Sequence, residues 1–262
     1  MTNFDRRGRV LYVDQVPLTD IATEVGTPCY VYSRGMIEDN WRAMSNAFAN
    51  YPHLVCYSVK ANSNLAVLNV LSRLGSGFDI VSGGELERVL RAGGDPAKVV
   101  FSGVGKTQRE IEHALEVGIR CIDVESGAEL KRVNAVAARI GVQAPVAVRV
   151  NPDIDADTHP YIATGLIETK FGIPLEDAIA VYRSALQMSH ISIVGVAAHI
   201  GVLRAGTELR PLASVGDVLV AHTMSLVLRS GRWEAPCLGH GEGGADLMPS
   251  AAKLKAKGDV AG

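Results

Sequence analysis

The feature that most constrains the fold is an alternation, between residues 54 and 200, of short apolar runs with amphipathic stretches. The apolar runs are nearly continuous and rich in β-branched residues, which is typical of parallel strands covered on both faces. They predict strands at residues 54–57, 78–81, 99–102, 120–124, 146–150 and 193–199. A chain with this pattern is expected to fold as an α/β protein.

Between these strands, apolar residues recur at helical spacing over residues 84–92, 107–117, 128–140 and 175–188. Repeated strand–helix units build a parallel sheet, which is either open or closed into a barrel. The length of 262 residues is close to the about 250 that a (β/α)8 TIM-type barrel commonly needs. We therefore expect most of the chain to form such a barrel.

The first 32 residues do not follow this repeat. Residues 10–13 and 29–32 are predicted to be strands, with a short helix at residues 18–25 between them. Because these strands do not alternate regularly with helices, we expect residues 1–32 to belong to a second β-domain beside the barrel.

The composition excludes several classes of partner. The formal net charge of −2 gives no reason to expect nucleic acid or an anionic membrane as a partner. No run reaches the ~20 apolar residues that span a bilayer, and no apolar signal core follows the start of the chain. The four cysteines are far apart and lack metal-ligand spacing, so no metal is expected; they are Cys29, Cys56, Cys121 and Cys237. A cytoplasmic protein is the expectation.

Four chemically capable side chains stand at the ends of predicted strands: Lys60, Asp79, Arg149 and His199. In a parallel barrel these ends face one mouth, where catalytic groups collect. A lysine at the end of a buried strand can be partly desolvated, which favours the neutral amine needed for Schiff-base chemistry. Each side chain also has an ordinary interpretation, respectively a surface lysine, a loop carboxylate, an ion-pair partner and a hydrogen-bonded core histidine.

Two apparent motifs do not withstand inspection. Residues 103–107 resemble a phosphate-binding loop, but Val100 stands where that loop needs its first glycine. Asp153, Asp155 and Asp157 have the spacing of calcium ligands, but the glycine and the final glutamate of an EF-hand are missing.

Seven segments together resemble the diaminopimelate decarboxylase family, which is dependent on pyridoxal 5'-phosphate (PLP). They occur in the family's order at residues 57–62, 78–86, 101–107, 148–152, 164–165, 170–173 and 199–201. The resemblance extends over roughly residues 8–201. It implies an amino-acid carboxy-lyase that decarboxylates meso-2,6-diaminopimelate to L-lysine and that assembles as a homodimer.

Site residues follow from the same resemblance, position by position. It implies that Lys60 forms the Schiff base with PLP and that His199 stacks on the pyridine ring. Arg149 and Asp79 are expected close to the cofactor, with Arg149 near its phenolic oxygen. Glu85 is expected to support Asp79 and Lys60.

The sequence departs from the family after residue 201. Val202 and Leu203 replace the expected serine and glutamine, and the nearest counterpart of the glycine-rich phosphate loop contains Gly239, Gly241 and Glu242. That segment is either a degenerate phosphate loop or a linker, because Glu242 would repel a phosphate. We expect residues 33–245 to form an incomplete PLP-binding barrel and residues 246–262 a disordered tail. The alternative function is therefore a truncated, inactive remnant or a non-enzymatic partner of an intact decarboxylase.

Overall fold

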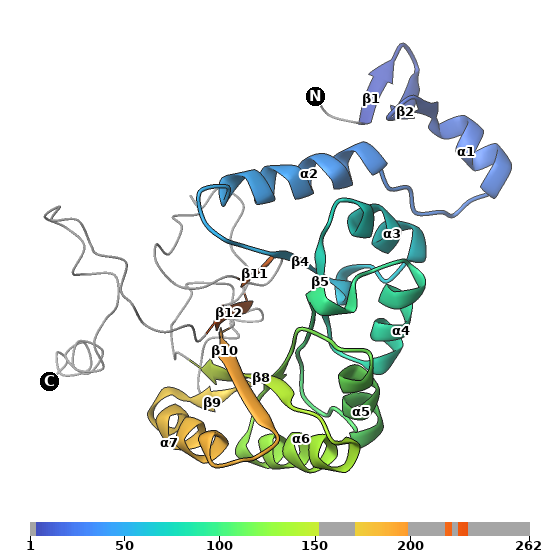
Figure 1. Cartoon of the computed structure of the whole chain (residues 1–262). Helices are drawn as coiled ribbons and strands as arrows, with labels where there is room; N and C mark the ends of the chain where they lie inside the picture. Colours follow the sequence, from blue (N-terminus) through green and yellow to red (C-terminus); the bar gives the residue numbers. More distant parts are fainter. Residues whose placement is uncertain (1–3, 152–170, 199–217, 222–224, 230–262) are drawn as a thin grey trace, which may run out of the picture.

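The computed structural model describes residues 4–151, 171–198, 218–221 and 225–229. An α/β barrel forms most of it, and a small antiparallel sheet lies apart from the barrel at the N-terminal end (Figure 1). None of the described helices is both long and apolar enough to cross a membrane.

The small sheet consists of β1 (Phe4–Arg7), β2 (Val10–Val13) and β3 (Val16–Pro17), and α1 (Leu18–Val25) follows it. The strand predicted at residues 10–13 and the helix predicted at residues 18–25 are therefore confirmed. The strand predicted at residues 29–32 is wrong. No described strand pairs with this segment, and Tyr30 and Tyr32 are 92% and 59% exposed, so neither hydrogen bonds nor burial hold it as a strand. Helix α2 (Arg34–Ala47) then leads into the barrel.

All six predicted barrel strands are present. They are β4 (Val55–Ser58), β5 (Gly77–Ile80), β6 (Val99–Phe101), β7 (Cys121–Val124), β8 (Ala144–Asn151) and β10 (Ile191–Ala198). Each pairs in parallel with the next, and the short β9 (Ile173–Pro174) adds to β8. Helices cover the outside of these strands (Figure 1): α3 (Leu65–Arg73), α4 (Gly83–Arg91), α5 (Gln108–Glu116), α6 (Gly127–Ile140) and α7 (Leu175–Leu186). The expected α/β barrel architecture is confirmed for this part of the chain.

A hairpin completes the ring of strands. Strand β11 (Val218–Ala221) pairs in parallel with β4, and β12 (Ser225–Arg229) lies antiparallel between β11 and β10. The pairing thus runs from β4 through β8, β10, β12 and β11 back to β4. A complete (β/α)8 barrel would be parallel throughout, so the regular strand–helix part is incomplete over the residues that the structure describes, as expected.

The two faces of the parallel strands carry different side chains. The outer face packs large apolar residues such as Phe78, Phe101 and Ile122 against the helices. The inner face carries a separate cluster of small residues: Cys56, Val100, Cys121, Ala147 and Ala197. Because the residues inside the ring are small, the barrel interior has space for the polar side chains that lie closer to the carboxyl ends of the strands.

Candidate functional site

The inner face changes from apolar to polar towards the carboxyl ends of the strands. Two residues beyond members of the small apolar cluster stand Ser58 on β4, Ser102 just after β6, Asp123 on β7 and Arg149 on β8. On β5, Asp79 stands in the same way two residues beyond Gly77. Residues two apart on a strand point to the same face, so these side chains line the same end of the barrel interior. This is the end at which barrel proteins carry their sites.

Lys60 lies in η1 (Val59–Ala61), a 3-10 helix of one turn that follows β4 at this end. Its side chain is exposed, so the partial desolvation expected from the sequence is not found. Within the described residues, its amine makes no hydrogen bond or ion pair. The amine is therefore available to a ligand that enters the mouth.

Asp79 is buried beneath this turn, with 3% of its surface exposed. One carboxylate oxygen, Oδ2, accepts a hydrogen bond of 3.3 Å from the Ser58 hydroxyl, whereas Oδ1 has no partner in the described structure. Burial raises the pKa of Asp79, and this is opposed by the Ser102 hydroxyl and by the positive charge of Lys60. The positive charge of Lys60 therefore acts on the Asp79 carboxylate at this end of the barrel.

Glu85 stands in the first turn of α4, after the loop that leaves β5. Its Oε2 accepts a 2.6 Å hydrogen bond from the Val81 N–H, and its own N–H donates to the Ser82 hydroxyl over 3.2 Å. Burial raises the pKa of Glu85, with a further increase from the charge of Asp79 and a decrease from that of Lys60. The structure thus brings together three of the predicted site residues.

Arg149 reaches the same mouth from β8. Its Nη1 donates to Glu125 Oε1 over 2.8 Å, and the two side chains are 13% and 3% exposed. The guanidinium also lies 5.9 Å from the centre of the Phe171 ring. The positive charge of Arg149 lowers the pKa of Asp79, so Arg149 belongs to the same electrostatic site.

The remaining predicted site residues, His199, Gly239 and Gly241, lie outside the described residues. Their assignment to the cofactor site stays a prediction.

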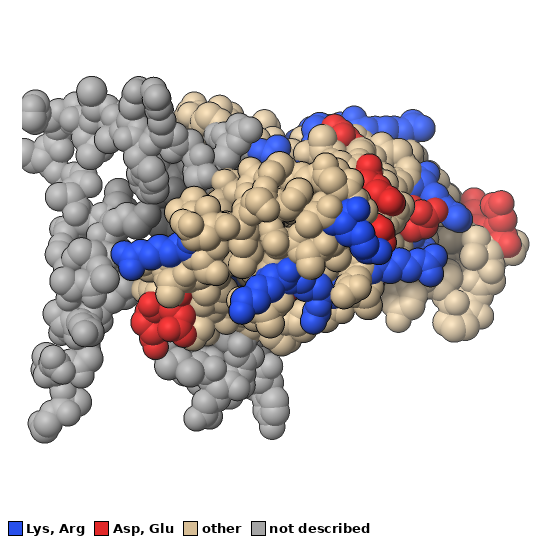
Figure 2. Space-filling model, turned by 60° about the horizontal axis from the view of Figure 1, so that its bottom comes forward, with Lys and Arg blue, Asp and Glu red and all other residues tan. Residues whose placement is uncertain are grey.

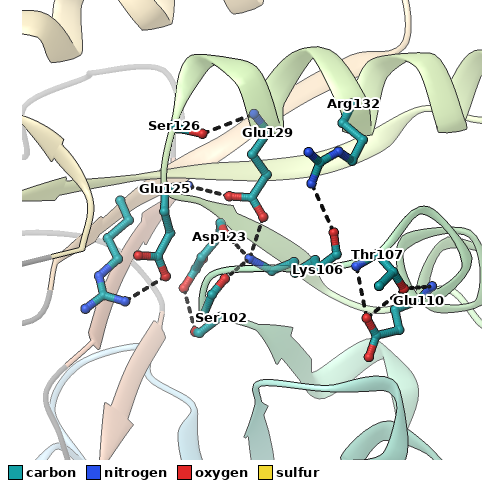
Figure 3. Close-up of polar contacts among 11 residues, drawn as sticks. Ser102, Lys106, Thr107, Glu110, Asp123, Glu125, Ser126, Glu129 and Arg132 are labelled. Atoms are coloured by element: carbon teal, nitrogen blue, oxygen red, sulfur yellow. Dashed lines mark hydrogen bonds and ion pairs between the residues drawn. The ribbon is translucent and has the colours of Figure 1, made fainter.

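Sequence reasoning missed a second polar group beside the first. Lys106 is buried, and its amine donates to the Asp123 carbonyl over 2.7 Å and to Glu129 Oε1 over 2.9 Å; these residues converge in Figure 3. The Ser102 hydroxyl donates to Asp123 Oδ2 over 2.9 Å. Lys106 is therefore an internal ion-pair partner, in agreement with the exclusion of a phosphate loop.

Asp123 is the most strongly perturbed acid of this second group. Burial, and next the charge of Asp79, raise the pKa of Asp123 to about 7. A repeat in the sequence could have revealed this group, because residues 123–133 reproduce the pattern of residues 79–89.

A barrel with a free lysine amine and buried carboxylates at its carboxyl-end mouth defines a class of protein suited to capture carbonyl compounds. Residues 34–209 match the family model described as "Pyridoxal-dependent decarboxylase, pyridoxal binding domain". The chain belongs to this family of PLP-dependent carboxy-lyases.

Similar proteins give a consistent picture. The chain is 61% identical over 201 residues to diaminopimelate decarboxylase of Pseudomonas aeruginosa, covering 77% of this chain and 48% of that protein. It is 54% identical over 224 residues to the Vibrio cholerae enzyme of the same name, covering 86% and 53%. The chain thus spans about half the length of these curated relatives.

Solved structures agree with these relatives. Diaminopimelate decarboxylase of M. jannaschii in complex with L-lysine matches with a TM-score of 0.72 and 36% identity, covering 77% of this chain and 49% of that one. The Helicobacter pylori enzyme of the same name, also complexed with L-lysine, matches with a TM-score of 0.70 and 41% identity, covering 74% and 49%.

Proposed function

We propose that this chain holds PLP through Lys60 and supplies the barrel part of a decarboxylase that converts meso-2,6-diaminopimelate to L-lysine. The observation that carries the proposal is the Lys60 amine, exposed at the mouth and without a partner in the described structure. The names of the similar proteins and the bound L-lysine in two matching structures support this substrate.

The described residues fit such a cofactor. The free amine of Lys60 suits an aldehyde, and the unpartnered Asp79 Oδ1 leaves a buried acceptor close to it. Arg149 adds a guanidinium that suits an anionic oxygen. When bound, PLP supplies an electron sink for the charge left on the substrate by loss of carbon dioxide. The roles of Lys60, Asp79, Glu85, Arg149, His199, Gly239 and Gly241 as site residues belong to this proposal.

The surface favours a small-molecule partner over nucleic acid. On the face seen in Figure 2, Lys and Arg side chains are interspersed with Asp and Glu and do not form one basic patch. A cytoplasmic location and a homodimer are part of the proposal and are supported by resemblance to the family alone. So is the assignment of residues 1–32 to a second β-domain, of residues 33–245 to the barrel and of residues 246–262 to a tail.

The decisive experiment is reductive trapping. The purified chain is incubated with PLP and borohydride, and the intact mass and peptide map are then recorded. We expect one adduct, confined to Lys60, which disappears in Lys60→Met. The matched control Lys131→Met, which changes an exposed lysine of α6, should retain the adduct. Absence of an adduct, or adducts scattered over many lysines, would contradict cofactor capture.

Turnover is tested separately, as carbon dioxide released from meso-2,6-diaminopimelate. Release that is lost in Lys60→Met supports the full proposal. An adduct at Lys60 without release would limit the chain to cofactor binding and contradict the decarboxylation part of the proposal.

A further inference from the structure

The barrel contains the same local unit twice. Residues 79–89 and 123–133 share Asp, Ser, Gly, Glu, Leu, Arg and Val at matching positions. The first segment runs from β5 into α4 and the second from β7 into α6, so the copies start on alternate strands. Side chains of alternate strands share one layer inside a barrel.

The hydrogen bonds of the two copies correspond. In each copy the serine hydroxyl accepts from the glutamate N–H at the helix start, at 3.2 Å for Ser82 and Glu85 and at 3.1 Å for Ser126 and Glu129. Each glutamate Oε2 then accepts from a backbone N–H four residues earlier, at 2.6 Å and 2.8 Å. Both glutamates therefore stabilise the loop between strand and helix.

In both copies an arginine of the helix also donates a hydrogen bond to a backbone carbonyl in the loop that precedes the copy. Arg88 donates to the Ser63 carbonyl over 3.3 Å, and Arg132 donates to the Lys106 carbonyl over 3.2 Å. Each of these loops carries a lysine, Lys60 in the first and Lys106 in the second.

The copies differ in what their lysine does. Lys60 is exposed, and its amine has no hydrogen bond within the described residues, whereas Lys106 is 2% exposed and bonded to Glu129. In the second copy the lysine amine is thus buried and paired, whereas in the first copy it is exposed. Because Lys106 is bonded internally, it is not available to a ligand, and any contribution of the second copy to the site comes through another residue.

That residue is Glu125, which the second copy holds in place. Glu129 accepts the Glu125 N–H through Oε2 while its Oε1 binds Lys106, as Figure 3 shows. The Glu125 carboxylate is buried, and it accepts from Arg149 over 2.8 Å through Oε1. Glu125 Oε2 has no partner in the described structure, so Arg149 is the cation that compensates this buried charge.

We propose that Glu125 is a positioning residue that fixes the Arg149 guanidinium at the barrel mouth, and that the Lys106–Glu129 ion pair fixes Glu125 in turn. The consequence for cofactor binding rests on the proposed function. A guanidinium held by a carboxylate keeps its remaining N–H donors in one orientation, which lowers the cost of binding an anionic oxygen.

The test uses Glu125→Gln, which removes the charge and nearly preserves the shape. Arginine labelling by phenylglyoxal, followed by peptide mapping, reports on Arg149 whether or not PLP binds. We expect labelling of Arg149 to rise severalfold in this variant while labelling of Arg120 and Arg132 stays constant. A general loss of structure would instead raise the labelling of all three. Glu125→Asp, which restores the charge, should return labelling towards the wild-type level.

The matched control is Glu112→Gln, which breaks another glutamate–arginine pair, the 3.0 Å contact with Arg139, where the arginine and glutamate side chains are 54% and 28% exposed. Its Arg149 labelling should equal that of the wild type. The PLP concentration for half-maximal trapping at Lys60 should rise about tenfold in Glu125→Gln and remain unchanged in the control.

The outcomes separate the two proposals. Unchanged Arg149 labelling in Glu125→Gln overturns the positioning role, whatever the chain does with PLP. If labelling increases at Arg149 alone in Glu125→Gln, the positioning role is supported. If the wild type also traps no PLP, the proposed function is contradicted while the positioning role stands. Increased labelling with an unchanged PLP requirement overturns the link between Glu125 and the cofactor. If Glu125→Gln does not fold, Glu125→Asp carries the test, with a smaller rise expected.

Discussion

The Lys106 amine lies 2.9 Å from Glu129 Oε1, and the two side chains are 0% and 8% exposed. Both charges have left water, so each depends on the other and on nearby backbone groups. Lys106 also donates to the carbonyls of Gly103 and Asp123, which ties the loop after β6 to β7. The ion pair therefore connects two adjacent strand–helix units at the end of the barrel that carries the site.

Removing one member of this pair should destabilise the chain strongly. Lys106→Met leaves the Glu129 carboxylate buried without its cation, which costs about 3 kcal/mol of unfolding free energy. Urea denaturation, followed by circular dichroism, measures the change. A decrease in unfolding free energy below about 1 kcal/mol would show that water reaches Glu129 and that the ion pair is not buried in solution.

Two controls make this measurement specific. Glu87→Gln breaks a surface pair with Arg91, in which the arginine and glutamate side chains are 70% and 49% exposed, and should change stability by no more than about 0.5 kcal/mol. The double variant Lys106→Met with Glu129→Gln removes both buried charges and should be more stable than Lys106→Met alone.

Gly77 should not tolerate a methyl group. A Cβ at this inner position of β5 would lie 2.5 Å from Cys56 Sγ and 2.7 Å from the Lys98 carbonyl oxygen. Because a backbone carbonyl cannot move aside as a side chain can, Gly77→Ala should lower the unfolding free energy by about 1 to 3 kcal/mol. The measurement is a urea midpoint, and a midpoint equal to the wild type would contradict this close packing.

Gly127 is the matched control for the Gly77→Ala substitution. A Cβ there meets nothing within 4 Å, and the residue lies in the first turn of α6. Gly127→Ala should leave stability unchanged or raise it by up to about 1 kcal/mol, because alanine restricts the unfolded chain and favours the helix.

The strands were predictable because their apolar runs are short, separate and bounded by turn residues. Two helices were not predicted. Helix α2 packs Ile37 and Trp41 against the core, but all of its residues keep some exposure and polar side chains fill much of its length, so no apolar stripe marks it in the sequence. Helix α3 is apolar over most of its length, which obscures the helical period. The segment at residues 29–32 has strand-like composition, but a strand also needs a neighbour, and composition does not supply one.

The candidate site was partly predictable for a topological reason. Parallel strands bring their carboxyl ends to one mouth, so the sequence alone groups Lys60, Asp79 and Arg149. The exposure of Lys60 and the pairing of Arg149 with Glu125 depend on how loops cover the strand ends, and no spacing in the sequence encodes that.

Asp123 gives the chain a pH-dependent stability. Its carboxyl group faces Asp79 on β5, the Ser102 hydroxyl after β6, and the positive charges of Lys106 and Arg149. Burial and the charge of Asp79 raise its pKa from the ordinary value of 3.8 to about 7. Between these two values the folded chain retains a proton that the unfolded chain has released.

The contribution of Asp123 to stability should therefore fall as the pH rises from about 4 to about 7, because the proton favours the folded state. Asp123→Asn keeps a neutral group of the same shape and removes this dependence. Its stability relative to the wild type should increase across the same range, by at most about 4 kcal/mol, the equivalent of the pKa difference. Urea denaturation over this pH range tests the expectation, with Asp39→Asn on the exposed surface of α2 as the control. Parallel curves for wild type and Asp123→Asn would show that Asp123 is already ionised in the folded chain.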